Sequence, residues 1–245
     1  MEVLARWTLV IGLLSVASLF LGPLLSGGRL LSPLTGFGLA SAGGALGIFG
    51  LVVGSIAAVR GGGPGTFAGV VICGTVAGLS LALVAWSRRY PPINDITTDT
   101  EDPPEFIRAL SLPANHGRDM SYPGESFARR QRAAYPDIVP LQLRLPPAEA
   151  FRFVEKAARE MHRWKLTRAD PETMTLEGVA ETPLFRFLDD FVLQVRLDDG
   201  TGSVVAMRSR SREGRGDLGV NARRIREYLA ALRSDISSRS IRPRR

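Results

Sequence analysis

The chain has 245 residues and a formal net charge of +7, and its charges are unevenly distributed. Residues 1–86 hold only four charged side chains, whereas residues 208–245 hold 12 Arg against 4 acidic residues. The single cysteine, Cys73, excludes an intramolecular disulfide framework and a thiolate metal site. The two histidines lie far apart in the sequence and lack a third ligand pattern, so we expect neither a metal nor a cofactor.

Three apolar runs predict transmembrane helices at about 7–25, 37–59 and 67–86. Each run is free of charged residues and has about the 20 residues that a bilayer requires. Glycines recur at short spacing in the second run, at positions 43, 47, 50 and 54, and in the third at 74 and 78. Such spacing is typical of closely packed membrane helices. Residues 1–89 are therefore predicted to form a compact three-helix anchor, because no ionisable residue marks a transport path within a span.

Residues 90–137 contain paired prolines at 91–92 and 103–104, which favour extended chain and turns over helices. We interpret this segment as a linker that becomes an extended flank of the following domain. At the other end, residues 236–245 have no apolar period and are predicted to be a disordered basic tail.

Residues 138–235 are predicted to form an α+β domain with the element order β-α-β-β-β-β-α. The first helix begins after Pro146-Pro147, and the last spans about 217–235 with an apolar stripe that starts at Leu218. An antiparallel sheet of about five strands with both helices on one face would bury these stripes in a two-layer domain.

The last two strands have a well-specified register, in which Leu197 pairs with Ser203 across a short loop. This register places Val195 opposite Val205 and Leu193 opposite Met207, and a slip of one residue would turn every apolar side chain to the wrong face. It also places Asp190 opposite Arg210, which predicts a structural ion pair between them.

The strongest chemical pattern is basic. Arg208, Arg210 and Arg212 alternate along one strand, and Arg215, Asp217 and Asn221 follow at the start of the last helix. Guanidinium groups near a helix N-terminus predict a site for a phosphate, a lipid headgroup or a carboxylate. The competing interpretation is a set of ion pairs with Asp189, Asp190, Glu213 and Asp217. No catalytic residues are assigned, and nucleic acid is not an expected partner because the basic stretch lacks interleaved aromatic residues.

The tripeptide Arg-Gly-Asp at 215–217 is interpreted as a strand-to-helix junction and not as an adhesion signal. In this interpretation Gly216 lets the chain turn, and Asp217 accepts N–H bonds from the first turn of the helix.

Several separated motifs resemble domain-of-unknown-function family 1499 across about residues 94–232. They are NDITTD at 94–99, DPPEF at 102–106, AYPDIVPL at 134–141, TPLFRFLDD at 182–190 and RSRSREGRGDLGVNARRI at 208–225. The resemblance implies a membrane-attached or exported bacterial domain without an established activity. One departure is Gly216, where the family pattern commonly has Ser.

The charged residues that flank the spans do not decide orientation, because Arg6 and Arg60 on one side oppose Arg29, Arg88 and Arg89 on the other. The resemblance favours a multi-pass protein of the bacterial inner membrane with a periplasmic domain. The leading hypothesis is a membrane-anchored, non-enzymatic domain that binds an anionic or lipid-like ligand or a membrane protein partner. The alternatives are a hydrolase-like enzyme that uses Asp190 or Asp217 with the arginines, and a structural accessory subunit of a membrane complex.

Overall fold

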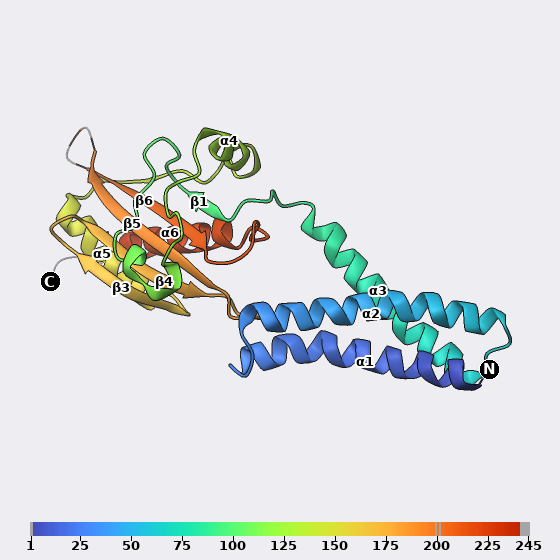
Figure 1. The fold of residues 1–245 in the computed structure, drawn as a ribbon. Coiled ribbons are helices and arrows are strands. Elements are labelled where there is room, and N and C mark those ends of the chain that lie inside the picture. The colour runs from blue at the N-terminus through green and yellow to red at the C-terminus, as the bar shows by residue number, and fades with distance from the viewer. Residues whose placement is uncertain (1, 199, 201, 241–245) are drawn as a thin grey trace. The chain divides into compact units, whose positions relative to one another are not determined.

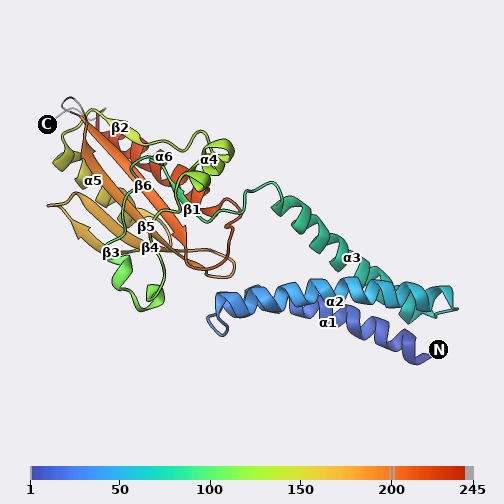
Figure 2. The same ribbon diagram turned by 45° about the horizontal axis from the view of Figure 1, so that its top comes forward.

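Two units divide the chain in the computed structural model, which describes residues 2–198, 200 and 202–240 (Figure 1, Figure 2). The first unit contains the chain up to Arg89 together with Pro183–Arg186. The second contains Tyr90–Thr182 and the chain from Phe187 onward. The division between Arg89 and Tyr90 coincides with the end of the predicted anchor.

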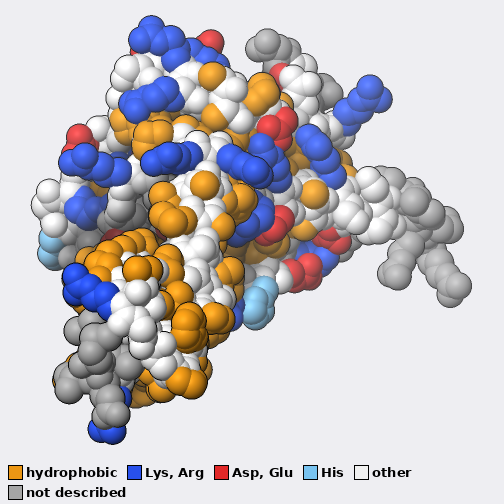
Figure 3. Space-filling view, turned by 90° about the vertical axis from the view of Figure 1, so that its right-hand side faces the viewer, with side chains coloured by type: hydrophobic (Ala, Val, Ile, Leu, Met, Phe, Trp, Pro, Cys, Tyr) orange, Lys and Arg blue, Asp and Glu red, His pale blue; other side chains and the backbone are white. Residues whose placement is uncertain are grey.

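Three helices form most of the first unit: α1 (Glu2–Gly27), α2 (Pro33–Val59) and α3 (Pro64–Ser87). All three are long and apolar enough to cross a membrane. The large hydrophobic side chains along them are mostly exposed, and the surface of this unit in Figure 3 is largely hydrophobic. A surface of this kind requires a lipid environment, so the chain is membrane-anchored.

Glycines of α2 allow both neighbouring helices to approach closely. A Cβ atom on Gly43 would lie 2.7 Å from the carbonyl oxygen of Ser15 in α1, and one on Gly47 would lie 2.7 Å from Cγ1 of Val76 in α3. The α2 glycines at 43, 47, 50 and 54 therefore serve contacts inside the unit, as their spacing predicts. In contrast, a Cβ atom on Gly78 of α3 would meet no described atom within 4 Å.

An antiparallel six-stranded sheet forms the centre of the second unit. Its strands are β1 (Asp95–Thr97), β2 (Leu141–Leu143), β3 (Trp164–Asp170), β4 (Thr175–Glu181), β5 (Leu188–Leu197) and β6 (Ser203–Ser211). The order is β1-β6-β5-β4-β3, and β2 also pairs with β6. Both short strands share one edge of β6, with β2 at its start and β1 near its end. The strand beyond the five expected is β1, which comes from the segment predicted to be an extended flank.

The predicted register of β5 and β6 is confirmed. Leu197 lies opposite Ser203, and the pairs Val195–Val205, Leu193–Met207 and Asp190–Arg210 follow. Odd-numbered side chains of both strands therefore face one side of the sheet and even-numbered side chains face the other.

Helices α5 (Pro147–Glu160) and α6 (Val220–Ser240) cover the face with the odd-numbered side chains of β5 and β6 (Figure 1). Their contacts include a hydrogen bond of 2.9 Å from the Tyr228 hydroxyl to the Val154 carbonyl oxygen. The Trp164 ring stacks on Tyr228 with centroids 5.3 Å apart, which closes the core beside α5 and α6. The fold is thus α+β with α5 and α6 on one face, as predicted.

The opposite face lies beneath residues 99–122, which we call the strap. The strap contains two short 3-10 helices, η1 (Ala109–Ser111) and η2 (Pro113–Asn115), and contributes Phe106, Ala109 and Met120 to a small apolar cluster with Val192. It is followed by α4 (Glu125–Ala134), a helix within the segment predicted to be extended chain and turns, so that prediction is corrected here. Helix α4 borders the free edge of β1. There the Gln131 side chain exchanges hydrogen bonds of 3.0 and 2.6 Å with the backbone of Thr97. The strap therefore forms a third, irregular layer over the sheet.

Candidate functional site

Arg208 is buried between the sheet and the strap and forms hydrogen bonds with both. Its side chain is 1% exposed, and its Nε and Nη2 atoms donate to the two carboxylate oxygens of Asp95 at 2.9 and 2.7 Å. Further hydrogen bonds reach the carbonyl oxygens of Pro104 and Met120 in the strap. The guanidinium also lies 4.8 Å from the ring centroid of Phe106. Arg208 is therefore a clamp between β6, β1 and the strap, and its donors are used within the chain.

Asp190 has a different partner from the one predicted. Its carboxylate accepts hydrogen bonds of 3.0 and 2.6 Å from Arg212, and a third of 2.9 Å from the Asn115 side chain. Arg210 instead lies 3.6 Å from Asp95, which occupies the register position across from it on β1. The expected Asp190–Arg210 pair is corrected: β1, which the sequence pattern did not reveal, places the Asp95 carboxylate beside both Arg208 and Arg210.

A third arginine joins Arg210 and Arg212 at the end of β6. Arg118 of the strap donates to the carbonyl oxygen of Ser211 at 3.1 Å and to Oδ1 of Asn115 at 2.7 Å. Ser211 lies between Arg210 and Arg212 in β6, and the side chains of these two arginines project from the same face of the strand. Arg118 therefore contacts the strand between them. We call Arg118, Arg210 and Arg212 the arginine cluster.

The arginine cluster is crowded with like charge. Burial lowers the pKa of Arg118, and the neighbouring charges of Arg210 and Arg212 lower it further, against an opposing effect of Asp190. Within the described chain, the Nε atom of Arg210 is buried and has no hydrogen-bond partner. Its Nη1 atom donates to the carbonyl oxygen of Ser121 at 3.1 Å. All three side chains are partly buried, so their charges are only partly screened by water.

Two other predicted site residues lie on the opposite face of the sheet. Asp217 accepts hydrogen bonds from the backbone N–H groups of Gly219 at 2.9 Å and Asn221 at 2.7 Å. The Asn221 side chain bonds the hydroxyls of Ser209 and Ser211, whose odd numbers place them on the helix-covered face. These residues organise the junction between β6 and α6 and do not join the arginine cluster.

The start of α6 differs from the prediction. The helix begins at Val220, and Leu218 has a φ of 53° and is exposed, so it does not start the buried stripe. The stripe begins instead at Ala222 and includes Tyr228. At its other end α6 continues to Ser240, past the predicted end at 235; residues 241–245 of the predicted tail lie outside the described residues.

The Arg-Gly-Asp tripeptide is not displayed as a unit. Arg215 and Gly216 are exposed, but Asp217 is buried, and its carboxylate accepts a hydrogen bond from the first turn of α6. Burial raises the pKa of Asp217, against the lowering effect of the N–H bonds from Asn221 and Gly219. The tripeptide is a strand-to-helix junction as interpreted, and Asp217 accepts the expected N–H bonds. The turn does not depend on Gly216, because the left-handed backbone positions of this junction are Gly214, Leu218 and Gly219.

Other buried carboxylates are also bonded within the fold. Glu177 accepts three backbone N–H bonds, from Ile107 at 3.2 Å, Arg108 at 2.7 Å and Ala109 at 2.9 Å. Asp189 accepts a hydrogen bond from Arg224 on the face opposite Asp190. No group of three His, Cys, Asp or Glu side chains suited to a metal ion is found among the described residues. These carboxylates fix the strap and α6.

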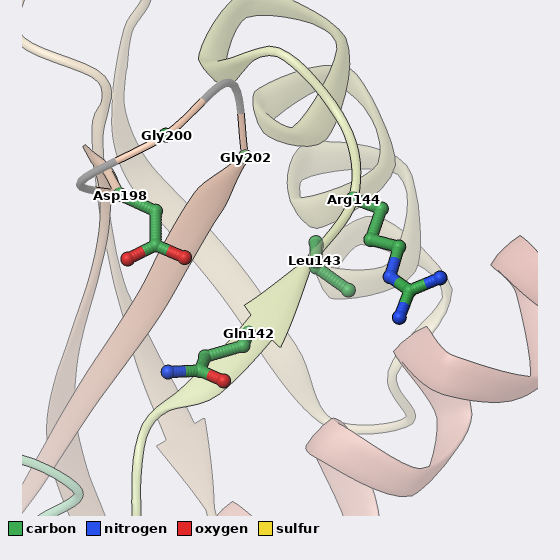
Figure 4. Close-up of a pocket in the computed structure, with 6 residues that line it drawn as sticks. All are labelled: Gln142, Leu143, Arg144, Asp198, Gly200 and Gly202. Carbon is green, nitrogen blue, oxygen red and sulfur yellow. The ribbon is translucent and has the colours of Figure 1, made fainter.

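A hollow lies at the other end of β6, away from the arginine cluster (Figure 4). It is lined by Gln142, Leu143, Arg144, Asp198, Gly200 and Gly202. Figure 4 shows the Arg144 side chain pointing away from Asp198, so the charged groups of the hollow do not converge. Ligand sites require polar groups that converge on one point, and this hollow lacks that arrangement.

The site and the fold together define a class of protein: a membrane-anchored α+β domain whose charged sheet face is covered by a strap. A family model described as "Protein of unknown function (DUF1499)" matches residues 95–232, which is more than half of the chain. The chain therefore belongs to the DUF1499 family. The matched region begins at Asp95, the partner of Arg208, and includes the strap, the whole sheet and most of α6. No curated protein matches the chain.

Proposed function

We propose that this protein is a membrane-anchored binding module that holds an anionic ligand at the arginine cluster. The observation that carries the proposal is the convergence of Arg118 on the strand between Arg210 and Arg212. Arg118 donates to two neutral oxygens, those of Asn115 and Ser211, and forms no salt bridge with a described residue. An oxyanion would relieve this crowding, because guanidinium groups bind carboxylate and phosphate through paired N–H donors.

The membrane anchor limits where this ligand is met. Only Arg88 and Arg89 separate α3 from Tyr90, the first residue of the second unit, so the domain stays tethered to the bilayer. The likeness to exported and membrane-attached proteins supports a position in the bacterial inner membrane with the domain on the periplasmic side. A lipid headgroup, a soluble anion and the carboxylates of a membrane protein partner would all be accessible to a domain held there.

Binding is better supported than hydrolysis. A general base needs an oxygen directed at the substrate, within hydrogen-bond reach of the proton that it removes. Asp190 is bonded to Arg212 and Asn115, and Asp217 is bonded to the backbone of α6. The second candidate is a structural accessory subunit, which is favoured by Arg208, because its donors serve contacts within the domain.

Thermal unfolding of the full-length protein in detergent tests the proposal. Sodium phosphate and sodium sulfate are compared with sodium chloride at constant ionic strength. A ligand at ten times its Kd stabilises by about 1.4 kcal/mol, which for a protein of this size raises Tm by about 3 to 6 °C.

The matched variants are Arg118→Gln and Arg210→Gln, with Arg159→Gln as control. Arg159 is an exposed arginine of α5, and α5 covers the other face of the sheet. The control matters because these salts also stabilise proteins through exclusion from their surfaces. The increase should persist in Arg159→Gln and disappear in the two cluster variants. If all four proteins respond equally, the arginine cluster is not a binding site, and the accessory subunit becomes the better interpretation.

A further inference from the structure

We infer that the arginine cluster selects a dianionic phosphate group, such as that of a phosphate monoester, over monoanions. This inference rests on the proposed function and adds the chemical class of the ligand. It follows from the charges at the end of β6 and from the different elements that carry the three arginines, the strap and the strand.

The charge count at this end of the sheet leaves an excess of positive charge. Two carboxylates, Asp95 and Asp190, lie beside four guanidinium groups: those of the arginine cluster and of Arg208. Asp95 is shared between Arg208 and Arg210, and Asp190 is held by Arg212. With both carboxylates charged, the buried and partly buried groups carry an excess of two positive charges. A monoanion would neutralise half of this excess, and a dianion would neutralise all of it.

Two further acids lie at the margin of the cluster and are exposed to solvent. Asp119 accepts hydrogen bonds from the backbone N–H of Ser121 at 2.9 Å and from its hydroxyl at 2.6 Å. These bonds lower the pKa of Asp119, with smaller contributions from Arg210 and Arg208. Glu213 follows Arg212 directly, and its charge raises the pKa of Arg118 against the larger lowering effects of burial and Arg210. Water and salt screen exposed charges of this kind, so they compensate the partly buried guanidinium groups weakly.

The geometry favours a tetrahedral ligand. Arg118 comes from the strap, whereas Arg210 and Arg212 come from the strand beneath it. A carboxylate presents two oxygens in one plane, whereas a phosphate monoester presents three oxygens around an axis, one for each guanidinium group. A phosphate bound here would therefore bridge the strap and the sheet.

Two sources offer the same chemistry: a soluble phosphate monoester, and the monoester headgroup of a lipid such as phosphatidic acid. A lipid phosphodiester such as phosphatidylglycerol carries one charge and should bind weakly. We infer that the arginine cluster distinguishes a phosphate monoester from a diester. It does not distinguish a lipid from a soluble compound.

The test is calorimetric titration of the full-length protein in detergent with methyl phosphate, dimethyl phosphate, acetate and sulfate at pH 5 and pH 7.5. The second pKa of a phosphate monoester is about 6, so the dianion fraction of methyl phosphate rises about tenfold between these values. Its affinity should rise by the same factor of about ten. Sulfate is a dianion at both values, so its affinity should stay constant, and its titration controls for any change in protein charge.

The outcomes separate this inference from the proposed function. If dimethyl phosphate or acetate binds as tightly as methyl phosphate at pH 7.5, the site exists but the dianion selectivity is wrong. If no anion binds saturably, the proposed function fails as well. Arg118→Gln should lose binding while it keeps the wild-type circular dichroism spectrum, and Arg159→Gln should bind as the wild type does.

Nanodiscs then distinguish the two sources. Phosphatidic acid in the disc should compete with methyl phosphate if the natural ligand is a lipid headgroup, and phosphatidylglycerol should not. Equal methyl phosphate affinity in both discs assigns the site to a soluble monoester. Competition by phosphatidylglycerol as strong as that by phosphatidic acid contradicts the inference, because it shows that one negative charge is sufficient.

Discussion

Arg208 and Asp95 form a two-bond ion pair in which both side chains are 1% exposed. The two residues are 113 positions apart in the sequence, and their pair joins β1 to β6 beneath the strap. A buried pair of this kind is sensitive to the loss of one partner, because the other charge then remains buried without compensation.

Replacement of Arg208 by Met should therefore destabilise the second unit strongly. The expected cost is about 3 to 5 kcal/mol, since the buried Asp95 carboxylate would lose both hydrogen bonds from Arg208 and keep only Arg210, at 3.6 Å. Thermal unfolding in detergent measures the effect. The double variant Arg208→Met with Asp95→Leu should recover part of the loss. An Arg208→Met protein that melts within about 2 °C of the wild type would show that the clamp is not important for the fold.

Replacement of Glu177 by Gln should loosen the strap without unfolding the sheet. Glu177 accepts the backbone N–H groups of three consecutive strap residues, 107–109, and hydrogen bonds to a charged acceptor contribute about 1.5 to 3 kcal/mol each. We expect hydrogen exchange at these amides to accelerate by a factor of about 10 to 100. The matched control is Glu172→Gln in the exposed turn between β3 and β4. Equal exchange in both variants would contradict the role of Glu177.

Replacement of Asp217 by Asn should change how stability depends on pH. Burial raises the pKa of Asp217 in the folded protein, whereas an unfolded Asp titrates at about 3.9. The folded state thus holds this proton more tightly, so the contribution is fully present below about pH 4 and is lost as pH rises through the folded pKa. The stability of the wild type relative to Asp217→Asn should fall over this range by at most about 1.4 kcal/mol per pH unit. A constant or rising difference would refute the assignment.

The periplasmic position is tested by a cysteine placed at Glu172. The natural Cys73 is completely buried within α3 and provides a low background. In intact spheroplasts, an impermeant maleimide should label Glu172→Cys as fully as it does after lysis. Labelling that requires lysis would place the domain in the cytoplasm.

Alternation of apolar side chains was enough to predict the β5–β6 hairpin, since a slip of one residue would have buried its charged side chains in the core. The strap was not predictable in the same way. It has no repeating apolar period, and its position depends on hydrogen bonds with distant residues of the sheet. Strap groups donate to Glu177 and Asp190, and Arg208 donates to the strap. Such contacts leave no periodic signal in a single sequence.

The candidate site was predicted only in part for the same reason. Arg210 and Arg212 were recognised because they alternate on one strand, but Arg118 is one of many arginines until the strap places it over Ser211. Asp217 and Asn221 were grouped with the arginines because they are close in sequence, although α6 draws them to the opposite face of the sheet. Residues that are close in sequence on either side of this strand-to-helix junction therefore lie on different faces of the sheet.

The most direct test of the central claim is equilibrium binding of radiolabelled inorganic phosphate to the purified full-length protein at pH 7.5. We predict saturable binding of one phosphate per chain to the wild type and to Arg159→Gln. The double variant Arg118→Gln with Arg210→Gln should show no saturable binding. Wild-type protein without saturable binding, or a double variant that binds as the wild type does, would contradict the account.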